Sequence, residues 1–214
     1  MKISKVFGAA ITGLVLVTSS AHAGLIDNGN STIDTASGLE WLDLTLTTGQ
    51  SYNNIHTDGF GGYAASGYVS ATLDQLCGLW GSLGDDTSGC ASTSPTQGIA
   101  LSTSSAAIFT SLLGVTYTPY TGTFGMYDSG LLSSGFVGLA CINGGASSGC
   151  ISGSPSLPNA IHIPSWIGTS DTHSLVGHWL VRSTSVPEPA TLGLLGLSLI
   201  GMGYTRRRKT IKSV

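Results

Sequence analysis

The feature that most constrains this chain is its C-terminal tail, which joins a proline-containing motif, an apolar run and a basic cluster. The motif is Pro187-Glu188-Pro189, and an uncharged run over residues 190–204 follows it. The basic cluster that ends the run consists of Arg206, Arg207, Arg208 and Lys209. A segment of this kind belongs to a membrane rather than to a water-soluble core, so the tail is set apart from the domain that precedes it.

The apolar run predicts a short transmembrane helix. A helix over residues 190–204 would be about 22 Å long, which is short against a hydrocarbon core of about 30 Å. Neighbouring residues and bilayer thinning can absorb this mismatch. The basic cluster is expected to stop the chain on the cytoplasmic side. Because prolines fit poorly inside a helix, Pro187 and Pro189 predict an extended segment just outside the membrane. A permanent anchor is the alternative interpretation.

The three parts, in this order, resemble the PEP-CTERM sorting signal of Gram-negative bacteria, which a membrane protease called an exosortase reads and cuts. The resemblance implies a sorting signal over residues 186–209, recognised through Pro187, Glu188 and Pro189, and a cytoplasmic tail over residues 210–214. It also implies the exosortase as a partner. A transient anchor in the inner membrane would then be followed by delivery to the cell surface or the extracellular matrix.

The first 23 residues predict export through the Sec translocon. Two lysines precede an apolar stretch over residues 6–17, and Ala21-His22-Ala23 is a small-x-small cleavage site. We therefore expect a signal helix that is cut after Ala23. The remaining part, residues 24–185, is long enough for one domain with its own core.

With both ends set aside, the remaining domain is strongly acidic. Arg182 is its one Lys or Arg residue, and ten of the chain's eleven acidic residues lie in it. The domain's formal charge is therefore −9, whereas that of the whole chain is −3. A surface without cations cannot neutralise phosphates, so nucleic acid is excluded as a partner. Anionic polysaccharide would be repelled unless divalent cations bridge the two. A neutral glycan or a protein partner is compatible with this charge.

The composition predicts a packed domain with an unusually uncharged polar surface. Only 9% of the residues are charged, and 31 are glycines. A disordered chain could have so many glycines too. Disorder, however, usually goes with high charge and few aromatic residues. Four tryptophans and repeated apolar runs favour a core instead. Hydroxyls and amides would then carry the polar surface, which suits an extracellular matrix.

Turn and strand signals alternate in the first part of the domain. Asn28-Gly29 predicts a hairpin turn between two strands over residues 25–34. A second turn over residues 34–38 leads into a strand with alternating side chains. Further strands are expected over residues 125–127, 137–142 and 161–163, between Gly, Ser and Pro clusters.

Two helices are expected beside these strands. Thr72 and Gln75 form a capping box that starts the first helix. Its buried stripe is predicted to be Leu73, Leu76, Cys77, Trp80 and Leu83. The second helix is expected over residues 104–113, with Gly114 as its C-terminal cap. Its buried face is predicted to be Ala107, Ile108, Ser111 and Leu112. The fold class is therefore α+β, a small and mostly antiparallel sheet flanked by two short helices, in addition to the signal helix and the C-terminal transmembrane helix.

Three segments resemble Lcl C-terminal-like domains. The run D-N-G-N-S-T-I-D-T-A-S-G-L-E-W over residues 27–41 looks like their opening. The run G-Y-V-S-A-T-L-D-Q-L over residues 67–76 looks like their entry into the first helix, and H-W-L-V-R over residues 178–182 looks like their closing strand. These domains resemble C-type-lectin folds, in which the first and last strands pair and two helices flank a small sheet. The resemblance implies this fold for residues 24–185, and no catalytic residues come with it.

The four cysteines fit an exported protein. Three pairings are open, and we favour Cys77 with Cys90 and Cys141 with Cys150 because each pair closes a short Gly-rich loop. Each bond would stabilise the fold by about 2–3 kcal/mol through loop entropy. A metal site is the alternative, but neither pair has C-x-x-C spacing and an oxidising compartment disfavours it.

The sole cation predicts an ion pair. If the last strand pairs beside the strand that follows Gly38, Glu40 or Asp43 would meet Arg182. We expect a bidentate pair between Arg182 and Glu40 across the two ends of the domain. The alternative is an exposed Arg182 without a partner.

The sequence contains no pattern that indicates a catalytic, metal or cofactor site. No spacing of His162, His173, His178 and Asp171 places two metal ligands on one helical face. No G-x-S-x-G elbow, phosphate loop or dinucleotide fingerprint is present. We therefore expect no catalytic residue, metal or cofactor, and a non-enzymatic exported protein with a structural role or a role in binding an exopolysaccharide or matrix protein. A secreted hydrolase that acts on matrix polymer is the alternative.

Overall fold

The computed structural model describes residues 24–90, 97–118, 121–143 and 160–184. Within these ranges, none of the helices is long and apolar enough to cross a membrane. The expected signal helix and its cleavage site, the Pro-Glu-Pro motif, the C-terminal transmembrane helix and the basic cluster all lie outside the described residues.

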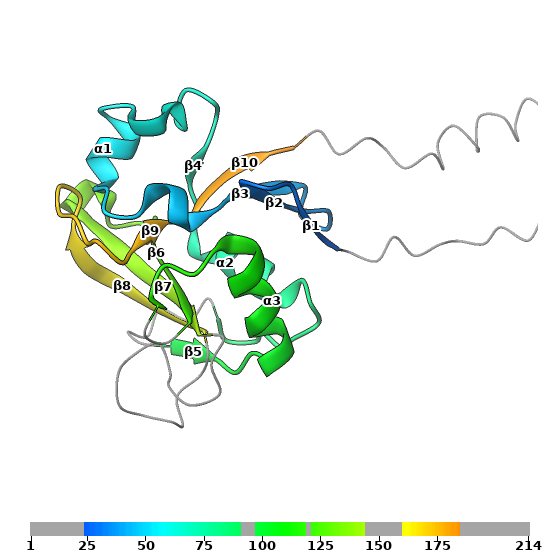
Figure 1. The fold of residues 1–214 in the computed structure, drawn as a ribbon. Coiled ribbons are helices and arrows are strands. Elements are labelled where there is room, and N and C mark those ends of the chain that lie inside the picture. Colours follow the sequence, from blue (N-terminus) through cyan, green and yellow to red (C-terminus); the bar gives the residue numbers. More distant parts are fainter. Residues whose placement is uncertain (1–23, 91–96, 119–120, 144–159, 185–214) are drawn as a thin grey trace, which may run out of the picture.

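The described chain is α+β and contains two five-stranded sheets (Figure 1). The first sheet is entirely antiparallel, in the order β1-β2-β3-β10-β4. Its strands are β1 (Leu25–Asp27), β2 (Ser31–Asp34), β3 (Leu39–Leu42), β4 (Val69–Ser70) and β10 (Leu180–Ser183). The predicted hairpin turn lies between β1 and β2, where Gly29 has a φ of 83° that a residue with a Cβ rarely adopts.

The second sheet has the order β5-β8-β7-β6-β9 and is antiparallel except for the parallel pair β6–β9. Its strands are β5 (Gln97–Ile99), β6 (Gly122–Tyr127), β7 (Phe136–Asn143), β8 (Ala160–Gly168) and β9 (Gly177–His178). The expectation of one small sheet is therefore corrected. Strands β6, β7 and β8 follow one another and pair with their neighbours in sequence, so they form a sheet of their own.

Three α-helices complete the described fold: α1 (Tyr52–His56), α2 (Leu73–Gly81) and α3 (Thr103–Leu113). The capping box that begins α2 is confirmed, since the Thr72 side chain accepts from the Gln75 backbone and the Gln75 side chain accepts from the Thr72 backbone. The predicted stripe is confirmed too: Leu76, Cys77 and Trp80 are buried, and Leu73 and Leu83 are partly buried against the core, although Leu83 lies beyond the end of α2. The helix also buries Leu79, which the stripe did not include.

The predicted face of α3 is wrong, because the buried face lies about two positions further back, on nearly the opposite side of the helix, and of the predicted residues only Leu112 packs partly against the core. Ala107 and Ser111 are exposed and Ile108 is 42% exposed. The buried face consists of Ser105, Ala106, Phe109, Thr110 and Leu113. Turning the helix in this way buries Phe109, which removes more apolar area from water than Ile108 would.

The main core lies between the two sheets and the helices α2 and α3, and it includes the fully buried Trp179. This residue stands between β9 and β10, where the chain leaves the second sheet and enters the first. Its indole Nε1 donates to the Ala140 carbonyl of β7 at 3.0 Å, and its ring meets Trp41 of β3 edge to face at 6.2 Å. Trp179 thus contacts both sheets, by a hydrogen bond to the second and a ring contact to the first.

Candidate functional site

The ion pair predicted between Arg182 and Glu40 is present, and it links the closing strand β10 to β3. Arg182 lies directly opposite Glu40 in the register of the two strands. The Arg182 Nε donates to Glu40 Oε2 and the Nη2 to Oε1, both at 2.9 Å, so the pair is bidentate. The bond joins residues that are 142 positions apart in the chain.

The carboxylate of Glu40 is buried and well supplied with donors. It is 6% exposed and also accepts from the Ser31 hydroxyl at 2.7 Å and the Tyr68 hydroxyl at 3.0 Å. The hydrogen bond from Arg182 lowers the pKa of Glu40 against the opposing effect of burial. Burial and the bond to Glu40 raise the pKa of Tyr68 to about 12. A carboxylate held this firmly in its charged form serves the fold rather than acid–base chemistry.

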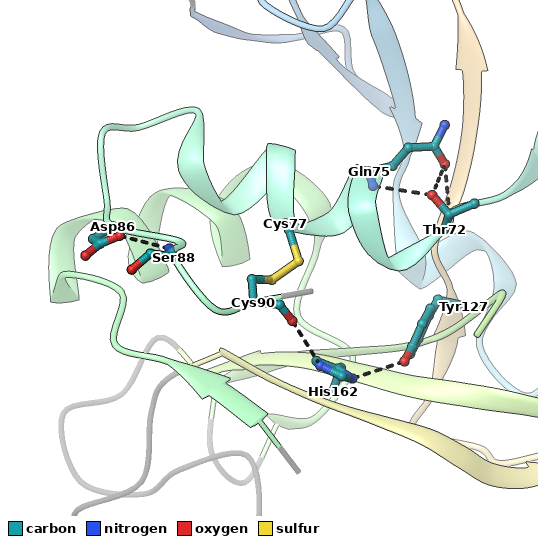
Figure 2. The surroundings of a disulfide bond; sticks show 8 residues. All are labelled: Thr72, Gln75, Cys77, Asp86, Ser88, Cys90, Tyr127 and His162. Atoms are coloured by element: carbon teal, nitrogen blue, oxygen red, sulfur yellow. Dashed lines mark hydrogen bonds between the residues drawn. A yellow bond between two sulfur atoms is a disulfide. The ribbon is translucent and has the colours of Figure 1, made fainter. Parts of the chain in front are cut away.

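The predicted pairing of Cys77 with Cys90 is present in the structure, with Cα atoms 5.8 Å apart. It ties α2 to the loop that follows it (Figure 2). Cys141 is disulfide-bonded, and its predicted partner Cys150 lies outside the described residues.

A buried histidine lies under this disulfide, on β8 (Figure 2). His162 Nε2 is 3.2 Å from the Cys90 carbonyl oxygen, which can only accept, so this nitrogen carries the proton. The Nδ1 atom, 3.2 Å from the Tyr127 hydroxyl, is then the acceptor. Burial lowers the pKa of His162. Both nitrogens are committed to hydrogen bonds within the domain, so neither is offered to a metal or a substrate.

A second buried histidine lies at the end of β9. His178 is fully buried, and its Nε2 donates to the Gln50 carbonyl at 2.9 Å. Burial lowers the pKa of His178 to about 4. His173, by contrast, is exposed and its ring lies 5.5 Å from that of Trp166. In the described ranges no three His, Cys, Asp or Glu side chains are grouped so that they could hold a metal ion, so His162, His173, His178 and Asp171 do not form such a site.

The structure shows one serine–histidine pair that sequence reasoning missed. His56 Nε2, at the end of α1, lies 2.9 Å from the Ser70 hydroxyl at the end of β4. The Tyr52 ring stacks on the His56 ring at 4.3 Å. Burial lowers the pKa of His56, and the charge of Asp128 opposes this effect. The two partners are 14 residues apart with no motif around them, so only the fold reveals the pair.

A shallow hollow of about 240 Å³ opens at the start of α2. It is lined by Thr72, Leu73, Asp74, Asp128, Ser129 and Gly130. None of these lining residues is aromatic. Trp41, Trp80 and Trp179 are at most 1% exposed and are not available to stack on a ligand.

The C-terminal tail matches the model of a known family. The model of the PEP-CTERM protein-sorting motif matches residues 185–209, directly after the last described residue. The chain is therefore an exported protein that an exosortase processes, with a membrane-associated sorting step. Searches among curated proteins and among solved structures find no match to this chain.

Proposed function

We propose that this chain delivers a non-catalytic domain to the cell surface or the exopolysaccharide matrix, where the domain has a structural or glycan-binding role. The observation that carries this proposal is the sorting motif over residues 185–209. It begins two residues after the end of β10, so the cargo of the sorting signal is the folded domain itself.

The internal chemistry of the domain supports a durable cargo. The Cys77–Cys90 bond requires the oxidising conditions found outside the cytoplasm. Glu40 and His162, two buried ionisable side chains, are spent on hydrogen bonds within the fold. Side chains used in this way hold strands and loops together and are not free to take part in catalysis.

We infer a C-type-lectin-like architecture for the domain from two features. The closing strand β10 pairs with β3, which belongs to the opening segment of the domain. Helices α2 and α3 both pack against the main core. The resemblance to Lcl C-terminal-like domains implied that the first and last strands pair, but among the described strands β1 pairs only with β2 and the strands form two sheets, so these two features support the inference only in part.

The hollow at the start of α2 is the favoured place for a glycan. The hydroxyls and carboxylates that line it can form hydrogen bonds with sugar hydroxyls, and the charge of −9 on residues 24–185 favours a neutral sugar over an anionic one.

On a glycan array, we expect Asp74→Ala to weaken binding of the mature protein by about tenfold, the effect of one lost charge-assisted hydrogen bond. Asp58→Ala removes the same charge at an exposed position outside the hollow and is the matched control. Equal binding by both variants would place the ligand elsewhere.

The sorting step is tested by the fate of the C-terminus in cells. We expect C-terminal mass spectrometry to find the mature protein clipped near Pro187, and fractionation to find it outside the inner membrane. Replacing Pro187, Glu188 and Pro189 together by alanine should leave the chain uncut and held in the membrane. An intact C-terminus in the wild-type mature protein would refute the proposal.

Hydrolysis of matrix polymer is the second candidate function, and the pair of Ser70 and His56 favours it. A histidine nitrogen 2.9 Å from a serine hydroxyl is the spacing of an activated nucleophile. A hydrolysis screen of the purified protein with ester and glycoside substrates tests this function. Turnover that Ser70→Ala abolishes would establish it, whereas turnover equal in wild type and Ser70→Ala would exclude this pair as its source.

A further inference from the structure

Both ends of the described domain meet at one turn. The Thr35 backbone donates to the Gly24 carbonyl at 3.1 Å, and the Thr184 backbone donates to the Gly38 carbonyl at 2.8 Å. Residues 34–38 form the turn between β2 and β3, which therefore touches the first and the last described residue. We call the turn, together with Gly24 and Thr184, the terminal pole; it lies where β1 begins and β10 ends (Figure 1).

The sorting motif is tied closely to this pole. Pro187 is three residues beyond Thr184, and three residues span at most about 11 Å. An enzyme that grips the Pro-Glu-Pro motif must therefore work next to the terminal pole, unless β10 first peels away from the sheet.

Strand β10 is poorly suited to peeling. It is hydrogen-bonded to β3 on one side and to β4 on the other. Leu180 and Val181 are buried, and Arg182 is held by Glu40 through two hydrogen bonds. The folded pole is thus what the enzyme meets.

The side chains of the pole are small and uncharged, although the domain around it is acidic, and cleavage after Ala23 would add the positive α-amino group of Gly24. Asp34 is 1% exposed, and its carboxylate turns inward to accept from the Ala36 backbone at 2.9 Å and the Ser37 hydroxyl at 2.7 Å. Ala36 and Ser37 are the exposed side chains of the turn. The acidic residue of β1, Asp27, lies at the opposite end of its strand, where the register pairs it with Thr32.

We propose that the terminal pole is the face of the cargo that lies against the membrane-embedded sorting protease during cleavage. Its small side chains give the enzyme the clearance to reach the motif while the domain stays folded. The inference rests on the proposed exosortase processing and adds the surface of the cargo that the enzyme contacts.

The test compares two bulky variants of the full chain in cells that contain the sorting system. Ala36→Trp enlarges the pole. Ser133→Trp is the matched control, since it places the same side chain at an exposed position in the connection between β6 and β7 of the second sheet. We expect Ala36→Trp to slow C-terminal cleavage by about tenfold, a cost typical of a steric clash in an interface, and Ser133→Trp to leave it unchanged. Cleavage of Ala36→Trp at the wild-type rate, or equal slowing of both variants, would overturn the proposal.

A linker variant distinguishes a steric clash at the pole from misfolding of Ala36→Trp. Inserting about eight Gly and Ser residues after Thr184 adds up to about 28 Å of reach and should restore cleavage of Ala36→Trp. Failure of this rescue would overturn the proposal. A photo-crosslinker at position 36 should capture the protease, and capture of lipid alone would also overturn it. Cleavage that persists after the Pro-Glu-Pro motif is replaced by alanines would instead refute the sorting assignment, whatever the pole does.

Discussion

At the scale of single residues, the buried His178 is expected to make the stability of the fold depend on pH in the acidic range. The pKa of His178 is lowered by burial to about 4, whereas an unfolded chain would keep the ordinary value of 6.5. Between these pH values His178 is protonated in the unfolded state and neutral in the folded state. Stability is therefore complete above pH 6.5 and is lost as the pH falls towards 4, by on the order of 3 kcal/mol.

Urea unfolding at a series of pH values measures this effect. His178→Gln keeps an N–H donor for the Gln50 carbonyl and removes the titration, so its stability should change less between pH 6.5 and 4 than that of the wild type. Parallel curves for the two proteins would show that His178 is not the group responsible.

Asp43 is expected to act in the opposite direction. Burial, and then the charge of Asp27, raise the pKa of Asp43 to about 6. A carboxyl group with a raised pKa favours the fold below its unfolded pKa and loses this contribution as the pH rises through 6. Asp43→Asn should therefore stabilise the protein at pH 7 by about 1 kcal/mol, a value discounted because the side chain is only partly buried. The gain should vanish near pH 4, and a variant less stable than the wild type at pH 7 would contradict the prediction.

At the scale of elements, the ion pair should decide how firmly β10 is held. Arg182→Met leaves the buried Glu40 without its cation, which we expect to cost about 2 kcal/mol, below the range for fully buried pairs because Arg182 is partly exposed. The double variant Glu40→Gln with Arg182→Met removes both charges and should recover part of this loss. Chemical denaturation with an unchanged m-value measures both. An unchanged midpoint for Arg182→Met would mean that the pair has no structural role.

The elements also show where sequence patterns suffice. Helix α2 could be predicted because its capping box and apolar stripe are local. The Glu40–Arg182 pair could be predicted because the domain has one Lys or Arg, and its strand was expected to lie beside the strand that carries Glu40. The face of α3 could not be predicted, since choosing Phe109 over Ile108 depends on the surface that the helix meets. Nor could the second sheet or the pair of His56 and Ser70, because strand partners and loop paths are fixed by contacts between distant residues.

At the scale of the whole molecule, the low number of ions does not make the domain electrically neutral. Residues 24–185 carry a formal charge of −9, and their one Lys or Arg side chain is committed to Glu40. The remaining carboxylates repel one another over distances that salt screens, with a Debye length of about 8 Å at physiological ionic strength. Self-repulsion of this kind destabilises a compact state.

The melting temperature of the mature domain should therefore rise with monovalent salt at pH 7. Going from low salt to about 0.5 M should raise it by a few degrees, since screening removes repulsion between exposed carboxylates. The partly buried Glu40–Arg182 pair is screened less than exposed charges, so most of its contribution should survive. The same titration on Arg182→Met is the control, because its slope should match that of the wild type even though its melting temperature is lower throughout. A melting temperature that falls with salt would mean that attractive pairs, rather than the net charge, dominate the electrostatics of the domain.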